Sequence, residues 1–422
     1  MFKEIEKYFQ FILKDSRGKK NLLFILIAFA VLISLFLLHY FVLNQFISDD
    51  LIVRFYQSNL LFVNNLSPYD ADVQQYISNI ISDRSLSPTA NVFDLEIALP
   101  QLIFYFPFSF FKDPIWGVSL FSTISSFAYL FAVFLLIKIT KNVHSGYETV
   151  LILVLSMTSM FFISNILMGT VAAINFLICI AVIYFMQDKK NLVAGIILGF
   201  LTFDIVTIPV LIGIYIFGLI KSKKTIAVTW AFISNALISL TFMVFDRDWM
   251  VGWLRNLFFD PQRVPFLTYP QALSLRYGFP TFQLFAIISL LFVIWGVFEA
   301  WQNPYNSSSS WLWVLGLGAI INYFLIIQFS DTSAIMLIIP MIFVFSIWKH
   351  RIGRKGKIIS FGFLAIFTAV FSALYYFYPA IDMQLMFDVF TLASAIFLVL
   401  NLYWLKRWAI IPFEYGQIFT EN

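Results

Sequence analysis

Long runs of apolar residues recur along almost the whole of this 422-residue chain. A helix needs about 20 mainly apolar residues to cross the hydrocarbon core of a bilayer, and the runs 21–46 and 115–137 already reach that length. Apolar residues make up 61% of the sequence and charged residues only 12%. A water-soluble protein would expose far too much of this apolar surface, so the sequence predicts an all-α polytopic membrane protein.

The few cysteine and histidine residues limit the chemistry that the chain can carry. Cys179 is the only cysteine and lies within an apolar run, which excludes an internal disulfide and a cysteine-ligated metal site. The three histidines show no metal-ligand spacing, and the common phosphate-loop, zinc-protease and serine-hydrolase motifs are absent. The lysines flank apolar runs and form no nucleic-acid-binding stripe. We therefore predict no metal, no cofactor and no nucleic-acid partner.

The positions of the cations predict the topology of the chain. Residues 1–20 carry six Lys and Arg residues and precede an apolar run that is longer than a signal-peptide core and has no cleavage site. We expect a cytoplasmic basic segment at 1–20, a transmembrane domain at 21–405 and a cytoplasmic tail at 406–422, because cations favour the cytoplasmic side.

Two segments decide how many helices cross. Keeping every lysine cluster in the cytoplasm requires that 97–112, which contains two prolines, dips into the membrane and returns. It also requires that 192–220 forms two short helices, turning near Asp204 at the floor of a water-filled depression. The expected result is about 12 transmembrane helices plus one re-entrant segment, with both termini cytoplasmic.

The longest polar interval, residues 47–96, is called the acidic loop below and holds seven carboxylates and two cations. Asp49 and Asp50 directly follow the first apolar run, where carboxylates are costly to hold near lipid, so we expect them to have a function. A solvated loop with an acidic bias is the alternative. Apolar residues at helical spacing around Phe55 and Ile77 predict two amphipathic helices that lie at the outer interface.

A second polar interval, residues 246–279, carries four arginines and is called the arginine loop. Two of these, Arg263 and Arg276, can hold a phosphate in bidentate fashion, and a carboxylate can act as general base towards a hydroxyl. Together with Asp204, these groups fit sugar transfer from a lipid phosphate to a hydroxyl acceptor. The alternatives are interfacial arginines and an Asp204 that only caps a helix.

Several short motifs resemble the first outer loop of the GT-C superfamily of polyprenyl-phosphate-sugar-dependent glycosyltransferases. They are Asp49-Asp50, Phe55-Tyr56, Ser67-Pro68-Tyr69-Asp70, and Leu99-Pro100 with Pro107-Phe108. The closest branch is the polyprenol-phosphate-mannose α-mannosyltransferases of bacteria and archaea. The resemblance implies a GT-C-like bundle in the cell membrane. It also implies inverting transfer of a sugar, mannose in that branch, from polyprenyl phosphate to a glycan, glycolipid or protein on the outer face.

The resemblance also assigns roles to residues. An acidic residue directly after the first helix is the catalytic base in that superfamily, which matches Asp49 or Asp50, with Asp49 preferred. Where related chains carry a Lys at the half-helix turn and an Arg in a late outer turn, this chain has Phe203-Asp204 and Asp331-Thr332. Phosphate binding is therefore expected from elsewhere, with Arg263 and Arg276 as the candidates.

The remaining candidates for donor or acceptor binding lie in the acidic loop. Tyr56 and Tyr69 belong to the motifs above, although the first can be a lipid-facing aromatic and the second part of a turn. Asp94 and Glu96 form an Asp-x-Glu that can bind a divalent cation, but the pair supplies fewer oxygen ligands than such a cation prefers, so a metal is the less favoured alternative here.

Two other classes of function are also compatible with the sequence. A transporter or lipid flippase also uses broken helices and carboxylates in the membrane, but it predicts related halves and several deep charges. A non-catalytic assembly subunit would leave the acidic pair dispensable.

Overall fold

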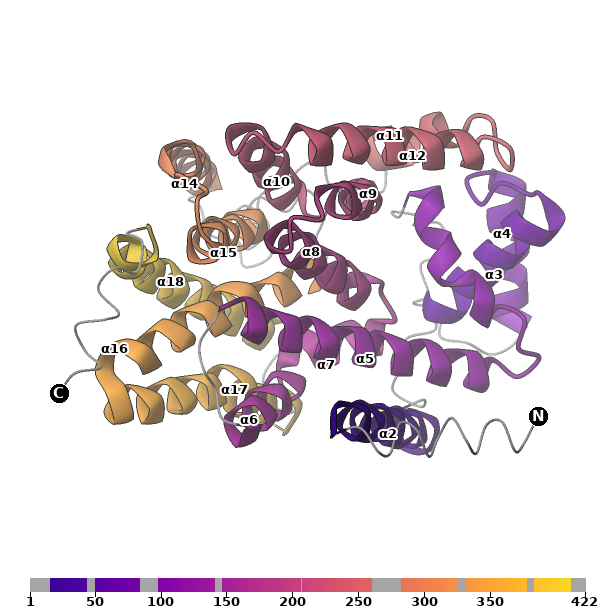
Figure 1. Ribbon diagram of the computed structural model, residues 1–422. Coiled ribbons are helices and arrows are strands. Elements are labelled where there is room, and N and C mark those ends of the chain that lie inside the picture. The colour runs from indigo at the N-terminus through magenta and orange to yellow at the C-terminus, as the bar shows by residue number, and fades with distance from the viewer. Residues whose placement is uncertain are drawn as a thin grey trace.

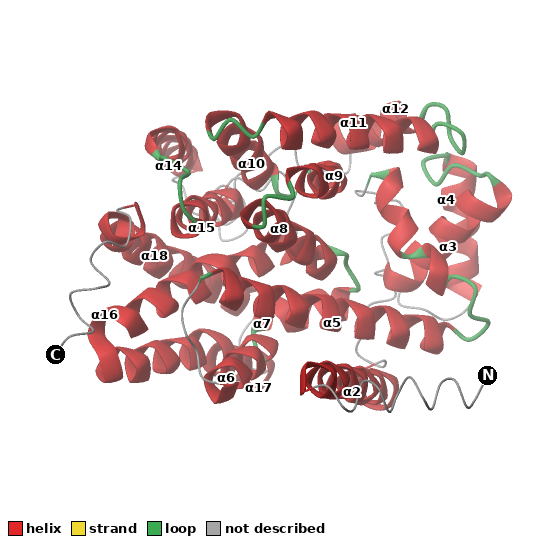
Figure 2. Cartoon of the chain, in the orientation of Figure 1, coloured by secondary structure: helices red, strands yellow, loops and turns green. Residues whose placement is uncertain are grey.

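The computed structural model is built from helices packed side by side (Figures 1 and 2), and none of the residues that it describes forms a strand. This confirms the all-α prediction. The described residues are 16–43, 50–83, 98–140, 146–205, 207–259, 282–324, 331–377 and 383–410.

The elements of the first half are α2 (Ser16–Leu38), the π-helix η1 (His39–Leu43), α3 (Asp50–Asn64), α4 (Ala71–Asp83), the 3₁₀-helices η3 (Leu99–Phe104) and η4 (Phe106–Phe108), α5 (Pro114–Ile139), α6 (Gly146–Met157), α7 (Met160–Met168) and α8 (Ala172–Gln187). Those of the second half are α9 (Asn191–Leu201), η5 (Thr202–Asp204), α10 (Pro209–Lys221), α11 (Thr225–Phe242), α12 (Trp249–Phe259), α14 (Phe282–Gln302), α15 (Ser308–Phe324), η6 (Asp331–Leu337), α16 (Ile338–Ala365), η7 (Ile366–Val370), α17 (Phe371–Phe377) and α18 (Met383–Ile410).

Several of these helices have the length and composition of membrane spans. Within the described residues, α5, α11 and the stretch Lys355–Leu374 each qualify alone, and α6 with α7 would be a fourth span if this bent pair crosses as one. Shorter apolar helices, α8, α9 and α10 among them, pack around these. The fold is therefore that of a helical membrane protein, while the count of about 12 spans stays a prediction.

One expected straight helix is bent. The apolar run over 147–165 predicts a single span, but the structure divides it into α6 and α7, which meet at an angle of 53°. At the bend the Thr158 hydroxyl donates to the Leu155 carbonyl at 2.8 Å. Such side-chain bonds compete with the helical backbone pattern and bend helices.

The segment expected to dip forms only the short helices η3 and η4. Ten residues, Leu99 to Phe108, rise by roughly 20 Å as 3₁₀-helix, which is less than the ~30 Å of the hydrocarbon core. Pro100 and Pro107 lie in the first turns, where a missing N–H costs nothing. This length is compatible with the dip, which stays a prediction; residues 99–108 are called the re-entrant segment for short.

The run 192–220 is broken, as predicted, into the short helices α9 and α10. α9 ends at Leu201, one 3₁₀ turn follows, and α10 begins at Pro209, a residue suited to the first turn of a helix. α9 lies against α11 because Gly195 and Gly199 have no side chain: a Cβ at Gly199 would overlap the Ser234 side chain. This spacing of small residues is typical of close helix contacts in membranes.

Among the described residues, two large apolar cores hold the helices together, and a small third cluster joins α3 to α4. The larger one joins α5, α8, α10, α15 and α16. The smaller one packs the acidic loop against the re-entrant segment and the helix break, through Leu51 of α3, Leu99 of η3, Phe121 of α5, Phe203 of η5 and Trp249 of α12. α3 and α4 lie at one end of the molecule and the turn within α16 at the opposite end (Figure 1).

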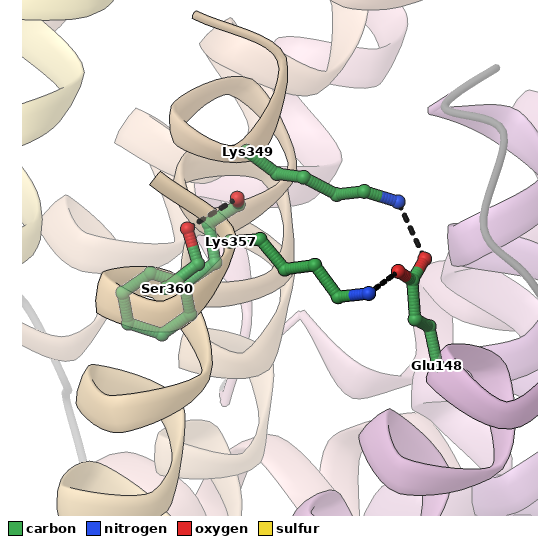
Figure 3. Close-up of polar contacts among 5 residues, drawn as sticks. Glu148, Lys349, Lys357 and Ser360 are labelled. Atoms are coloured by element: carbon green, nitrogen blue, oxygen red, sulfur yellow. Dashed lines mark hydrogen bonds and ion pairs between the residues drawn. The ribbon is translucent and has the colours of Figure 1, made fainter. Parts of the chain in front are cut away.

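An ion cluster holds that turn of α16. The helical pattern of α16 is interrupted at Gly353 (φ 61°), which divides this element into two arms. Lys349 and Lys357, one from each arm, both reach the Glu148 carboxylate at the start of α6 (Figure 3). The Ser360 hydroxyl also donates to the Phe345 carbonyl at 3.0 Å and joins the two arms directly.

Candidate active site

The first turn of α3 packs closely against the glycine that ends α7. Asp50, the first residue of α3, is half-buried, and Leu51 next to it is fully buried. Leu51 packs on Gly169, which ends α7 in the left-handed conformation (φ 65°) that favours glycine. A Cβ at Gly169 would overlap the Leu51 side chain. The first turn of α3, which begins at Asp50, is thereby packed onto the α7–α8 turn.

Five of the predicted site residues lie outside the described residues: Asp49, Asp94, Glu96, Arg263 and Arg276. Their proposed roles as base, ligand or phosphate-binding groups stay predictions.

Arg54 follows Asp50 by one turn of α3, and the sequence predicts no role for it. Its side chain is half-buried, and its Nη1 donates to Gln57 Oε1 at 3.0 Å. Gln57 itself is completely buried. Tyr56 is half-buried on the same helix. The spacing of Arg54 four residues after an acidic residue is a common surface ion-pair pattern, which is why it gave no distinct signal.

Tyr69 connects the acidic loop with the arginine loop. It stands in the turn between α3 and α4, its ring packs against Gly252 of α12, and its hydroxyl meets the backbone of Leu99. Two residues earlier, the Ser67 hydroxyl donates to Asp246 Oδ2 at 2.5 Å. The Ser67–Tyr69 turn is thus more than a local turn, because it joins three separate parts of the chain.

The phenol of Tyr69 stays protonated. Burial of this group raises its pKa well above the usual value, and the negative charge of Asp246 adds to that shift while Arg54 opposes it. A neutral phenol can donate a hydrogen bond to an anionic ligand.

Asp204 lies in the break between α9 and α10 and is buried. Its Oδ2 accepts a hydrogen bond from Asn175 Nδ2 of α8 at 2.6 Å, and the side chains of Gln101 and Thr207 also reach its carboxylate. Ile208, not Asp204, occupies the N-cap position of α10. The carboxylate therefore links the re-entrant segment, α8 and the helix break, and the capping alternative is wrong.

Tyr105 lies between these groups. It is buried, and its ring stacks on Phe121 at 4.9 Å between centroids. Its hydroxyl meets the backbone of Val171 and lies within electrostatic range of both Arg54 and Asp204. Tyr105 is therefore close enough to α3 and to the helix break to be influenced by the charges of both, which the separate sequence motifs do not reveal.

The described residues contain no group of three or more His, Cys, Asp or Glu that could hold a metal ion. The polar groups of the site are instead donors and acceptors suited to hydroxyl-rich and anionic ligands.

The site thus combines the polar side chains of α3 with a buried carboxylate at a helix break, in a helical fold typical of membrane proteins. The model of "Glycosyltransferase family 87" matches residues 99–347, over half of the chain. The chain belongs to this family and is a glycosyltransferase. No match was found among curated proteins.

The match confirms the enzyme class that the sequence motifs predicted, and it favours an enzyme over a transporter or an assembly subunit. It begins at Leu99 and so covers the re-entrant segment and Asp204, whereas α3 precedes it. The mannosyltransferase subtype stays a prediction.

Proposed function

We propose that this glycosyltransferase transfers a sugar, mannose in the first instance, from polyprenyl phosphate to a hydroxyl group of a glycan, glycolipid or protein. The observation that carries the proposal is the position of Asp50. Asp50 is the first residue of α3, which packs onto the α7–α8 turn, and Arg54 follows it by one helical turn. The buried Tyr105 lies within electrostatic range of Arg54 and of Asp204.

In this reaction Asp49 or Asp50 acts as general base. The carboxylate takes the proton of the acceptor hydroxyl while that oxygen forms a bond to the anomeric carbon. The bond between this carbon and the phosphate oxygen breaks on the opposite face, and the electron pair leaves with polyprenyl phosphate. Attack opposite to the leaving group inverts the configuration. The lipid phosphate is the activated leaving group, so the site needs neither a nucleotide nor a metal.

The other predicted residues would bind substrate around this centre. Tyr69, as a neutral donor, fits an acceptor or donor hydroxyl, and Tyr56 lies on the same helix as Asp50. Asp204 would orient sugar hydroxyls through the amides that surround it. We place the site on the outer face of the cell membrane and both termini in the cytoplasm, because only this arrangement puts all lysine clusters inside.

The base is tested by removing one carboxylate while keeping its shape. General-base assistance contributes roughly 10²–10⁴-fold, so Asp49→Asn or Asp50→Asn should lose at least 100-fold in kcat with the affinity for the donor retained. The milder of the two variants identifies the residue that only orients its neighbour. Full activity in both single variants and in the double variant would exclude a catalytic acidic pair.

A further inference from the structure

Gln57 carries an unsatisfied hydrogen-bond donor beside the Arg54 guanidinium. Its side chain is 0% exposed, and Arg54 Nη1 donates to its Oε1 at 3.0 Å. A guanidinium can only donate, so this contact fixes the carbonyl oxygen towards Arg54 and leaves the amide nitrogen on the other side. In the part of the chain that the structure describes, this Nε2 has no hydrogen-bond partner.

A buried amide donor without an acceptor costs about 1–3 kcal/mol, and native proteins rarely tolerate one that serves no purpose. Here the orphan donor belongs to the amide that the Arg54 guanidinium contacts. Guanidinium and amide groups both offer N–H bonds. A ligand that satisfies both of them must be rich in acceptor oxygens and negatively charged.

We propose that Arg54 and Gln57 bind the phosphate group of the polyprenyl donor and stabilise the negative charge that it gains as the sugar leaves. This inference rests on the proposed function and gives the phosphate a site in α3, in addition to or in place of Arg263 and Arg276.

The position within α3 fits such a role. Arg54 follows Asp50 by four residues, or about 6 Å along a helix axis, so one sugar ring can lie between the base and the leaving phosphate. The nearby carboxylate, Asp50, would repel a phosphate that lacked a cation of its own. An arginine one turn away compensates for that repulsion and can grip two phosphate oxygens at once.

Binding of farnesyl phosphate to the purified full-length protein in detergent micelles tests the inference without any sugar transfer. Farnesol serves as the uncharged comparison, because it shares the prenyl chain and lacks the phosphate. We expect Arg54→Gln to weaken farnesyl phosphate binding roughly tenfold or more and to leave farnesol binding unchanged, since a charged hydrogen bond is lost. Gln57→Leu should weaken it by a smaller factor, and Arg54→Lys should restore part of the loss.

Arg255→Gln is the matched control, because Arg255 is an exposed arginine on α12. It should bind farnesyl phosphate as the unmodified protein does. Unfolding temperatures of all variants show whether they fold. Unchanged affinity for farnesyl phosphate in folded Arg54→Gln and Gln57→Leu would overturn the inference. So would inorganic phosphate that binds through Arg54 as tightly as farnesyl phosphate, because the site would then recognise free phosphate.

The phosphate site and the proposed reaction can be accepted or rejected independently of each other. Loss of farnesyl phosphate binding in Arg54→Gln, in a protein that transfers no sugar from any polyprenyl donor, would support the anion site and reject the reaction. Sugar transfer from a polyprenyl donor, with farnesyl phosphate binding that is independent of Arg54, would do the opposite.

Discussion

Removing the Glu148 carboxylate should destabilise the protein, because two lysines from the two arms of α16 depend on it (Figure 3). The lysines differ in exposure: the Lys349 side chain is 17% exposed and the Lys357 side chain 42%. An uncompensated buried charge costs ~3–5 kcal/mol, whereas a largely exposed ion pair contributes ~0–1 kcal/mol. Glu148→Ala should therefore cost ~1–3 kcal/mol, more of it through Lys349 than through Lys357.

The two lysines provide the matched comparison. Lys349→Gln leaves the buried Glu148 without its better shielded partner and should lower the melting temperature more than Lys357→Gln, which removes a partner that water can replace. The double variant Glu148→Leu with Lys349→Met should recover much of the loss, since an apolar pair avoids the desolvation of both charges. Differential scanning fluorimetry of the detergent-purified variants measures these shifts. Equal losses for the two lysine variants, or no loss in Glu148→Ala, would refute the assignment of the energy to burial.

Three further predictions concern the fold around the site. Gly199→Val should destabilise the protein by ~1–3 kcal/mol, because the new side chain overlaps Ser234. Gly213→Val, at a position with open space around it, should leave the melting temperature unchanged. Equal melting temperatures of both variants would contradict the close α9–α11 contact. Asp204→Asn puts an amide donor against the donors of Asn175 and Gln101. The variant should lose ~1–3 kcal/mol of folding free energy and should lose sugar transfer as well. A variant as stable and active as the unmodified enzyme would show that the carboxylate is unnecessary. A cysteine introduced at Asn65 should react with an impermeant thiol reagent added outside the cell, and a cysteine introduced at Ser222 should react only from the inside. The background should be low because Cys179 is buried. Labelling of the Ser222 variant from outside would reject the reversal of the chain between α9 and α10.

The features predicted correctly from the sequence are those that local patterns determine. Apolar residues at helical spacing predict α3 and α4, and the structure has both helices. The polar Asp204 and the nearby Pro209 indicate a break in a long apolar run, and the structure breaks there. In each case the signal lies within a few residues of the feature, so no knowledge of tertiary contacts is needed.

The features that the sequence does not reveal depend on residues far apart in the chain. The hydrogen bond from Ser67 to Asp246 joins two loops that are 179 positions apart, and the position of Tyr105 between Arg54 and Asp204 requires three elements to pack together. Arg54 is equally compatible with an ordinary helical ion pair. Only the buried contact with Gln57 gives it a distinct role.

The central claim, that this family 87 glycosyltransferase uses a lipid phosphate donor, is tested most directly by a transfer assay. The purified protein is incubated with polyprenyl-phosphate-mannose bearing a labelled sugar, with a panel of glycan, glycolipid and peptide acceptors, and the anomeric configuration of each product is read by NMR. We predict labelled product whose configuration is inverted relative to the donor, with release of polyprenyl phosphate and no requirement for a nucleotide sugar or a divalent metal. Transfer from a nucleotide sugar but from no polyprenyl-phosphate sugar, or a product of retained configuration, would contradict the account.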